Sequence, residues 1–152
     1  MIGVAIPAHN EEACLDACLE ALLQAAAHPA LDSDVVCGSV AVDDWSPHAA
    51  SGLLLCARFA REHQDRDGHR HIHEANLGVS TAAYLAASGF AAVACHEDVL
   101  LVRALERLGA RFAWSALPRV STSARVDARA RGGFGDTLRA MAAGLEAGLQ
   151  VA

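Results

Sequence analysis

The chain has 152 residues, the length of one ordinary domain, and 53% of them are apolar, which excludes an intrinsically disordered protein. Its formal net charge of -6 argues against a nucleic-acid binder, because such proteins need a basic face to displace counterions. No apolar run approaches the ~20 residues that cross a bilayer, so we expect no membrane span. The first residues lack the basic stretch of a secretory signal, and the five cysteines lack framework spacing. We therefore expect a reducing, cytoplasmic location.

Predicted strands and helices alternate along the first half of the chain. Residues 2–6 and 35–42 are short β-branched, apolar runs, the pattern of buried strands. Between them, Asn10 can cap a helix whose leucines and cysteines recur with helical spacing to residue 23. An acidic turn follows the second strand, and the apolar spacing after it predicts a helix over residues 47–63.

The second half continues this alternation after a polar, turn-rich stretch over residues 63–76. Ser80 is expected to cap a short helix that ends at Gly89, and Gly109 to end an amphipathic helix over residues 98–108. We predict a strand over residues 111–115, irregular chain over residues 117–133 and a last helix over residues 135–149. Without a repeat or linker, the pattern predicts a single α/β domain, residues 1–152, with a mainly parallel sheet and flanking helices.

Two adjacent acids, Glu97 and Asp98, begin the helix over residues 98–108. Acids in a first helical turn stabilise the helix dipole by about 0.3 to 1 kcal/mol, which explains the pair without any function. A carboxylate at a strand-to-helix junction also suits a general base that deprotonates a hydroxyl. Spacing alone favours the first role and leaves the second open.

Four segments resemble, in order, the family-2 glycosyltransferases, which are nucleotide-sugar-dependent enzymes with the GT-A fold. They are "VAIPAHNEEACLDACLEALLQ", "DGHRHIHEANLGVSTAAYLAASGF", "HEDVLLVRALERLGARFAWS" and "PRVSTSARVDARARGGFGDTLRAM". Their combination is similar to a bacterial subgroup in which a Glu-Asp pair precedes a helix. The resemblance implies a Rossmann-like GT-A fold of reduced size.

The same resemblance implies transfer of a sugar from a nucleotide-diphosphate donor to an acceptor hydroxyl, with inversion. Asp98 would be the general base, and Glu97 beside it would orient the acceptor. The nucleotide would be held by the turn after the first strand, which consists of Pro7, Ala8, His9, Asn10 and Glu11. This assignment favours the catalytic role of the acid pair without removing its role as a helix cap.

Arginines gather in the irregular stretch near residue 125. Guanidinium groups match phosphate oxygens, so Arg125 and Arg129 could close over the donor diphosphate as a lid. A solvated charged loop is the alternative explanation.

A diphosphate leaving group normally needs a divalent cation, Mg2+ or Mn2+, on oxygen ligands. The family carries an Asp-x-Asp metal motif at the end of a strand, and no such triplet ends a predicted strand here. The chain is also shorter than the family, as if a central block near residue 33 were missing. In a second register, Asp43 and Asp44 in "VAVDDWSP" resemble the aspartates that contact the nucleotide. Because adjacent side chains of an extended segment diverge, the two would not share one ion, and Asp44 is a candidate ligand by itself.

His69, His71 and His73 alternate, so an extended segment would present all three on one face. A polar surface loop is the simpler explanation, and metal binding is the alternative. The resemblance places this segment near the acceptor side, which makes His73 a second candidate metal ligand. The cysteines have no metal-site spacing and are expected in the core.

Two functions therefore remain open. The first is a shortened glycosyltransferase that takes a nucleotide-sugar and a hydroxyl acceptor. The second is a non-catalytic remnant of the family that forms a homo-oligomer over the missing part of its sheet and binds nucleotide weakly or not at all.

Overall fold

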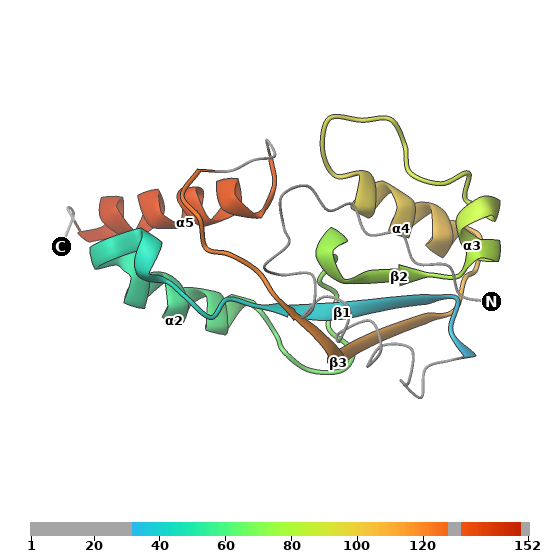
Figure 1. The fold of residues 1–152 in the computed structure, drawn as a ribbon, viewed down its shortest axis with the longest axis horizontal. Coiled ribbons are helices and arrows are strands. Elements are labelled where there is room, and N and C mark those ends of the chain that lie inside the picture. The colour runs from blue at the N-terminus through green and yellow to red at the C-terminus, as the bar shows by residue number, and fades with distance from the viewer. Residues whose placement is uncertain (1–31, 128–131, 150–152) are drawn as a thin grey trace, which may run out of the picture. The chain divides into compact units, whose positions relative to one another are not determined.

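The structure, a computed structural model, describes residues 32–127 and 132–149, which divide into two compact units (Figure 1). Unit 1 contains residues 32–41, Asp65–Ala91 and Glu97–Val120. Unit 2 contains Val42–Gln64, Ala92–His96 and the described residues from Ser121 onward. In the described part of the chain, no helix combines the length and the apolar character that a membrane span requires.

Unit 1 is built on a small open sheet with the strand order β2-β1-β3 among the described residues. The strands are β1 (Val35–Ala41), β2 (Leu77–Val79) and β3 (Phe112–Ser121). β1 and β2 are antiparallel, with Val36 opposite Gly78. β3 runs in the same direction as β1, because hydrogen bonds join the N–H of Asp34 to the carbonyl of Arg111 and the hydroxyl of Ser39 to the carbonyl of Ala116 (Figure 1). The fold is therefore mixed α/β, with one antiparallel pair.

Unit 1 also contains three helical elements, η3 (Glu74–Asn76), α3 (Thr81–Ala86) and α4 (Glu97–Arg107), of which α3 and α4 were predicted from the sequence pattern. The buried core joins β1 to α4 through Val35, Cys37, Leu101 and Leu105. Burial of each such leucine contributes about 1.5–3 kcal/mol. Burial also raises the pKa of the Cys37 thiol to about 12, so this cysteine is a core residue, as predicted, and not a reactive thiolate.

Two of the predicted helix boundaries are confirmed. The hydroxyl of Ser80 accepts a hydrogen bond from the N–H of Ala83 at 3.3 Å, so it caps α3. Gly109 follows α4 with a φ of 73°, the left-handed conformation that ends a helix. α3 itself is shorter than predicted, because it ends at Ala86 and not at Gly89.

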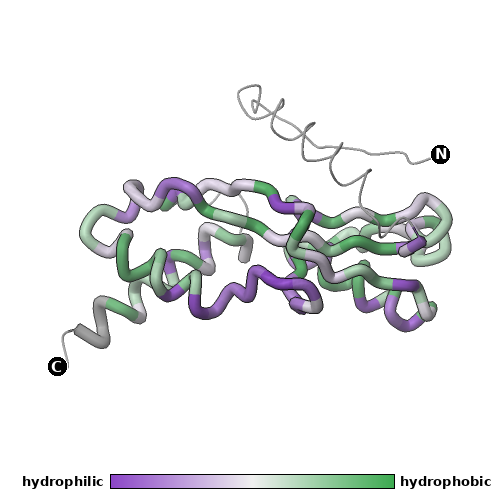
Figure 2. The backbone as a smooth tube through the Cα atoms, turned by 90° about the horizontal axis from the view of Figure 1, so that it is seen from below, coloured by the Kyte–Doolittle hydropathy of each residue, from purple (hydrophilic) through white to green (hydrophobic). Residues whose placement is uncertain are grey.

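The strands differ more from the prediction. β2 was missed because it has only three residues, too few for an alternating pattern. β3 was predicted to end at Ser115, but it continues to Ser121 through Pro118. Proline is tolerated at the edge of a sheet, and β3 is an edge strand among the described residues. Figure 2 shows apolar and polar stretches alternating along the backbone of the described residues.

Unit 2 contains η2 (Ser46–Ser51), α2 (Gly52–Glu62) and α5 (Phe134–Leu149), which confirms the predicted helices over residues 47–63 and 135–149. α2 packs on α5, and Leu55 and Leu138 are fully buried. The ring of Phe59 is tilted against that of Trp45 and edge-on to that of Phe134, with centroids 5.5 and 5.9 Å apart. These aromatic contacts stabilise the helix pair beyond the area that they bury.

Candidate functional site

The acid pair lies where the sequence predicted it, at the start of α4. Glu97 is the first helical residue, and both acids are half-buried. The Oδ1 of Asp98 accepts a hydrogen bond from the N–H of Val99 at 2.7 Å. Asp98 therefore satisfies an N–H of the first turn, which is the capping role that spacing had favoured.

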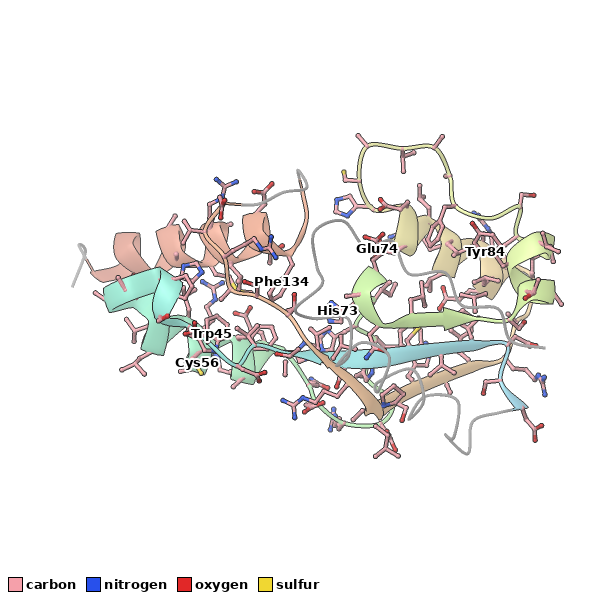
Figure 3. The ribbon with its side chains drawn as sticks, viewed as in Figure 1. Trp45, Cys56, His73, Glu74, Tyr84 and Phe134 are labelled. Atoms are coloured by element: carbon pink, nitrogen blue, oxygen red, sulfur yellow. The ribbon has the colours of Figure 1, made fainter. Side chains whose placement is uncertain are left out.

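A third carboxylate, that of Glu74, joins this pair from η3. Partial burial raises the pKa of Glu74, and the negative charges of Glu97 and Asp98 raise it further. Figure 3 shows Glu74 beside the first turn of α4. The sequence analysis missed Glu74 because its neighbours form a polar stretch without periodicity, and only the tertiary structure brings η3 to α4. We call these three residues the acidic group.

The residue before the acidic pair has an unusual backbone. His96 has a φ of 63°, in the left-handed region that residues other than glycine rarely adopt. Such strain persists only where surrounding contacts fix the chain, and it is concentrated at functional sites. The turn into α4 is therefore a place where a carboxylate is held in a set direction.

The three alternating histidines do share one face, as predicted. The rings of His69 and His71 stack with centroids 5.7 Å apart, and those of His71 and His73 with centroids 6.0 Å apart. His69 is buried, and its Nδ1 accepts from the N–H of His71. The proton is therefore on Nε2, which donates to the carbonyl of Ser115 at 3.2 Å. His69 holds the segment against β3.

His71 and His73 are half-buried, whereas His69 is buried. Burial lowers the pKa of His71, and the neighbouring His69 lowers it further. The nitrogens that each of the two side chains can offer to a metal lie within 4.8 Å of one another. His73 remains a candidate ligand.

The aspartates after β1 lie in unit 2. The carboxylate of Asp43 accepts a hydrogen bond from the hydroxyl of Ser121, and Oδ1 of Asp44 accepts from the N–H of Ser46 at 2.9 Å. These hydrogen bonds from Ser46 lower the pKa of Asp44, so it is ionised. The two carboxylates thus accept hydrogen bonds from different partners. Both help to shape the turn into η2.

Two Asp-x-Asp triplets occur outside strand ends, and the sequence analysis passed over them. Asp34 closes the triplet before β1, and Arg111 pairs with its carboxylate at 3.2 Å and lowers its pKa. In the second triplet, Asp65 pairs with Arg119 at 3.0 Å. Asp67 of the same triplet accepts from the hydroxyl of Ser115 and the N–H of Ala116. These contacts hold β3 in place along its length, which is a structural role.

Most of the residues predicted to contact the nucleotide lie outside the part of the chain that the structure describes. Pro7, Ala8, His9, Asn10, Glu11 and Arg129 lie outside the described residues. Arg125 is half-buried in unit 2. The acidic group and His73 belong to unit 1.

A surface pocket of about 280 Å³ in unit 1 lies at the other end of α4. Its lining includes Leu105, Leu108 and several alanines of α3, with Asp34 as its acid. Because the acidic group lies at the first turn of α4, this apolar pocket does not hold a substrate against it.

Comparisons with protein-family models, with curated proteins and with solved structures found no match for this chain. What the chain does must therefore be inferred from the residues and contacts described above.

Proposed function

We propose that the chain is a shortened glycosyltransferase domain of the GT-A type, which transfers a sugar from a nucleotide-diphosphate donor to an acceptor hydroxyl. The observation that carries the proposal is the acidic group at the turn into α4. Three carboxylates gather there, and one of them, Glu74, has a raised pKa. Perturbed carboxylates with a charged partner are typical of sites that transfer protons.

Asp98 is the general base in this proposal. Inverting transfer needs a carboxylate that takes the proton of the acceptor hydroxyl as the hydroxyl oxygen attacks the anomeric carbon. The bond from that carbon to the diphosphate breaks in the same step, and the nucleoside diphosphate leaves with the electron pair. Asp98 is half-buried and is oriented by the N–H of Val99, while Glu97 and Glu74 supply hydroxyl-binding oxygens.

Asp98→Asn tests the assignment. We expect turnover of a nucleotide-sugar to fall by about 10²–10⁴-fold, the usual contribution of a general base, while donor affinity changes little because the base acts in the transition state. Release of nucleoside diphosphate measures turnover, and calorimetry measures donor binding. Glu106→Gln is the matched control, because Glu106 lies on the same helix near its other end, where it pairs with Arg70. Undiminished turnover in Asp98→Asn would remove Asp98 from the mechanism.

A second candidate function is a non-catalytic member of the same family. The metal motif expected at a strand end is absent, and the carboxylates of Asp65 and Asp67 are engaged with Arg119 and β3. On this alternative, the wild-type chain binds nucleotide weakly or not at all and transfers no sugar. Turnover by the wild-type chain decides between the two.

A further inference from the structure

The segment before η3 brings two imidazoles close together. His73 has an extended backbone, with φ -135° and ψ 117°, so the side chains at positions 71 and 73 lie on the same face. Their rings are inclined by 27° with centroids 6.0 Å apart. The potential ligand nitrogens of the two side chains lie within 4.8 Å of each other.

We propose that His71 and His73 chelate one divalent transition-metal ion of the Ni2+ or Zn2+ type. A metal–imidazole bond is about 2.0–2.1 Å long, so two nitrogens on one ion lie roughly 3–4 Å apart. The two nitrogens need to approach by no more than about 1–2 Å to reach that geometry. Rotation of two half-buried rings about χ1 and χ2 supplies such a movement without a change in the backbone. Water fills the remaining positions on the ion.

The surroundings favour a cation at this place. Metals bind the neutral form of imidazole. Glu74, which follows His73 directly, brings the negative charge of the acidic group to the same segment. A negative potential raises the local concentration of cations.

Ligand type separates this site from the cation of a sugar transfer. Imidazole suits Ni2+, Zn2+ and Cu2+, whereas carboxylate and phosphate oxygens suit Mg2+ and Mn2+. Metal binding by the two histidines therefore does not depend on the proposed glycosyl transfer. Either proposal can be wrong while the other is correct.

Calorimetric titration of the full chain with NiCl2, and then with ZnCl2, tests the proposal. We expect one ion per chain and a loss of affinity of about tenfold or more in both His71→Gln and His73→Gln, because even the outer-shell partners of a metal site are worth that much. His48→Gln is the control, since His48 is a half-buried histidine of unit 2, and its affinity should equal that of the wild type.

Circular dichroism of each variant without metal shows whether it folds. If either variant does not fold, paramagnetic broadening by Ni2+ of the imidazole resonances in the wild-type chain gives a second measurement. Broadening that is strongest at His71 and His73 supports the site. Absence of 1:1 binding, unchanged affinity in folded variants, or broadening that spares these two rings would overturn it.

Discussion

Gly38 occupies the point at which β1 comes closest to its neighbours. The side-chain amide of Asn76 donates to the carbonyls of Ser39 and Pro118 at 2.7 and 2.6 Å, and so ties β1 to β3. A Cβ at position 38 would overlap both this amide and the carbonyl of Pro118. Gly38 is therefore required by the close packing of β1 against Asn76 and β3.

Gly38→Ala should therefore destabilise the fold by roughly 1–3 kcal/mol, the usual cost of overpacking. Urea unfolding followed by circular dichroism measures it. Gly78→Ala is the matched control on the neighbouring strand, because its Cβ would meet nothing closer than 3.8 Å. Equal effects of the two substitutions would mean that strand propensity, and not the Asn76 contact, governs position 38.

Glu74 gives a prediction that depends on pH. Its pKa is raised in the folded chain, so the folded state binds the proton more tightly than the unfolded state does. The resulting cost to stability is fully present above the folded pKa and absent below the unfolded value near 4.5. Glu74→Gln should therefore raise the free energy of unfolding at pH 7, by less than about 1 kcal/mol because solvent screens an exposed side chain.

The comparison that checks this prediction is urea unfolding of the wild type and of Glu74→Gln at pH 7 and at pH 4. The gain should shrink at the lower pH, where Glu74 takes up a proton. An equal gain in the free energy of unfolding at pH 7 and at pH 4 would mean that the effect comes from packing or helix propensity and not from charge.

At the scale of the elements, α4 shows how well the spacing of apolar residues predicts which side chains of a helix are buried. The i, i+3 spacing places Val102, Leu105 and Leu108 on one face, and Val102 and Leu105 are buried, but Leu108 follows the end of α4 and is 58% exposed. Leu101, which this spacing leaves out, is buried as well. The spacing of apolar residues located the helix. Its packing against the sheet determined which of its faces is buried.

Leu105→Ala should lower the free energy of unfolding by about 2–5 kcal/mol, because it opens a cavity between α4 and the sheet. Leu108→Ala is the control three residues away, and we expect a change within about 0.5 kcal/mol. Thermal or urea unfolding distinguishes them. Similar losses in both variants would mean that Leu108 is covered in the folded protein.

For the molecule as a whole, the missing strand-end metal motif predicts how nucleotide binding responds to metal. The affinity for UDP should differ by less than about threefold, or roughly 0.6 kcal/mol, between Mn2+ and a chelator. Calorimetry of the full chain measures both conditions. A large gain with Mn2+ would show that a hard-cation site is assembled from residues other than a strand-end Asp-x-Asp, and it would count against the non-catalytic alternative.

The sequence by itself determined the main helices of the described residues, the cap at Ser80, the stop at Gly109 and the location of the acid pair, because these depend on neighbours three or four residues apart. It located β1 for a similar reason, since a buried strand is a continuous apolar run. It also predicted the shared face of His69, His71 and His73, which follows from an extended backbone.

Only the tertiary structure decided what depends on residues far apart in the chain. It brought Glu74 to Glu97 and Asp98, and it paired the three residues of β2 with β1. It also paired Asp65 with Arg119, and it brought Asp67 to Ser115 and Ala116 of β3. Each of these contacts joins residues that are far apart in the chain, so no local pattern encodes it.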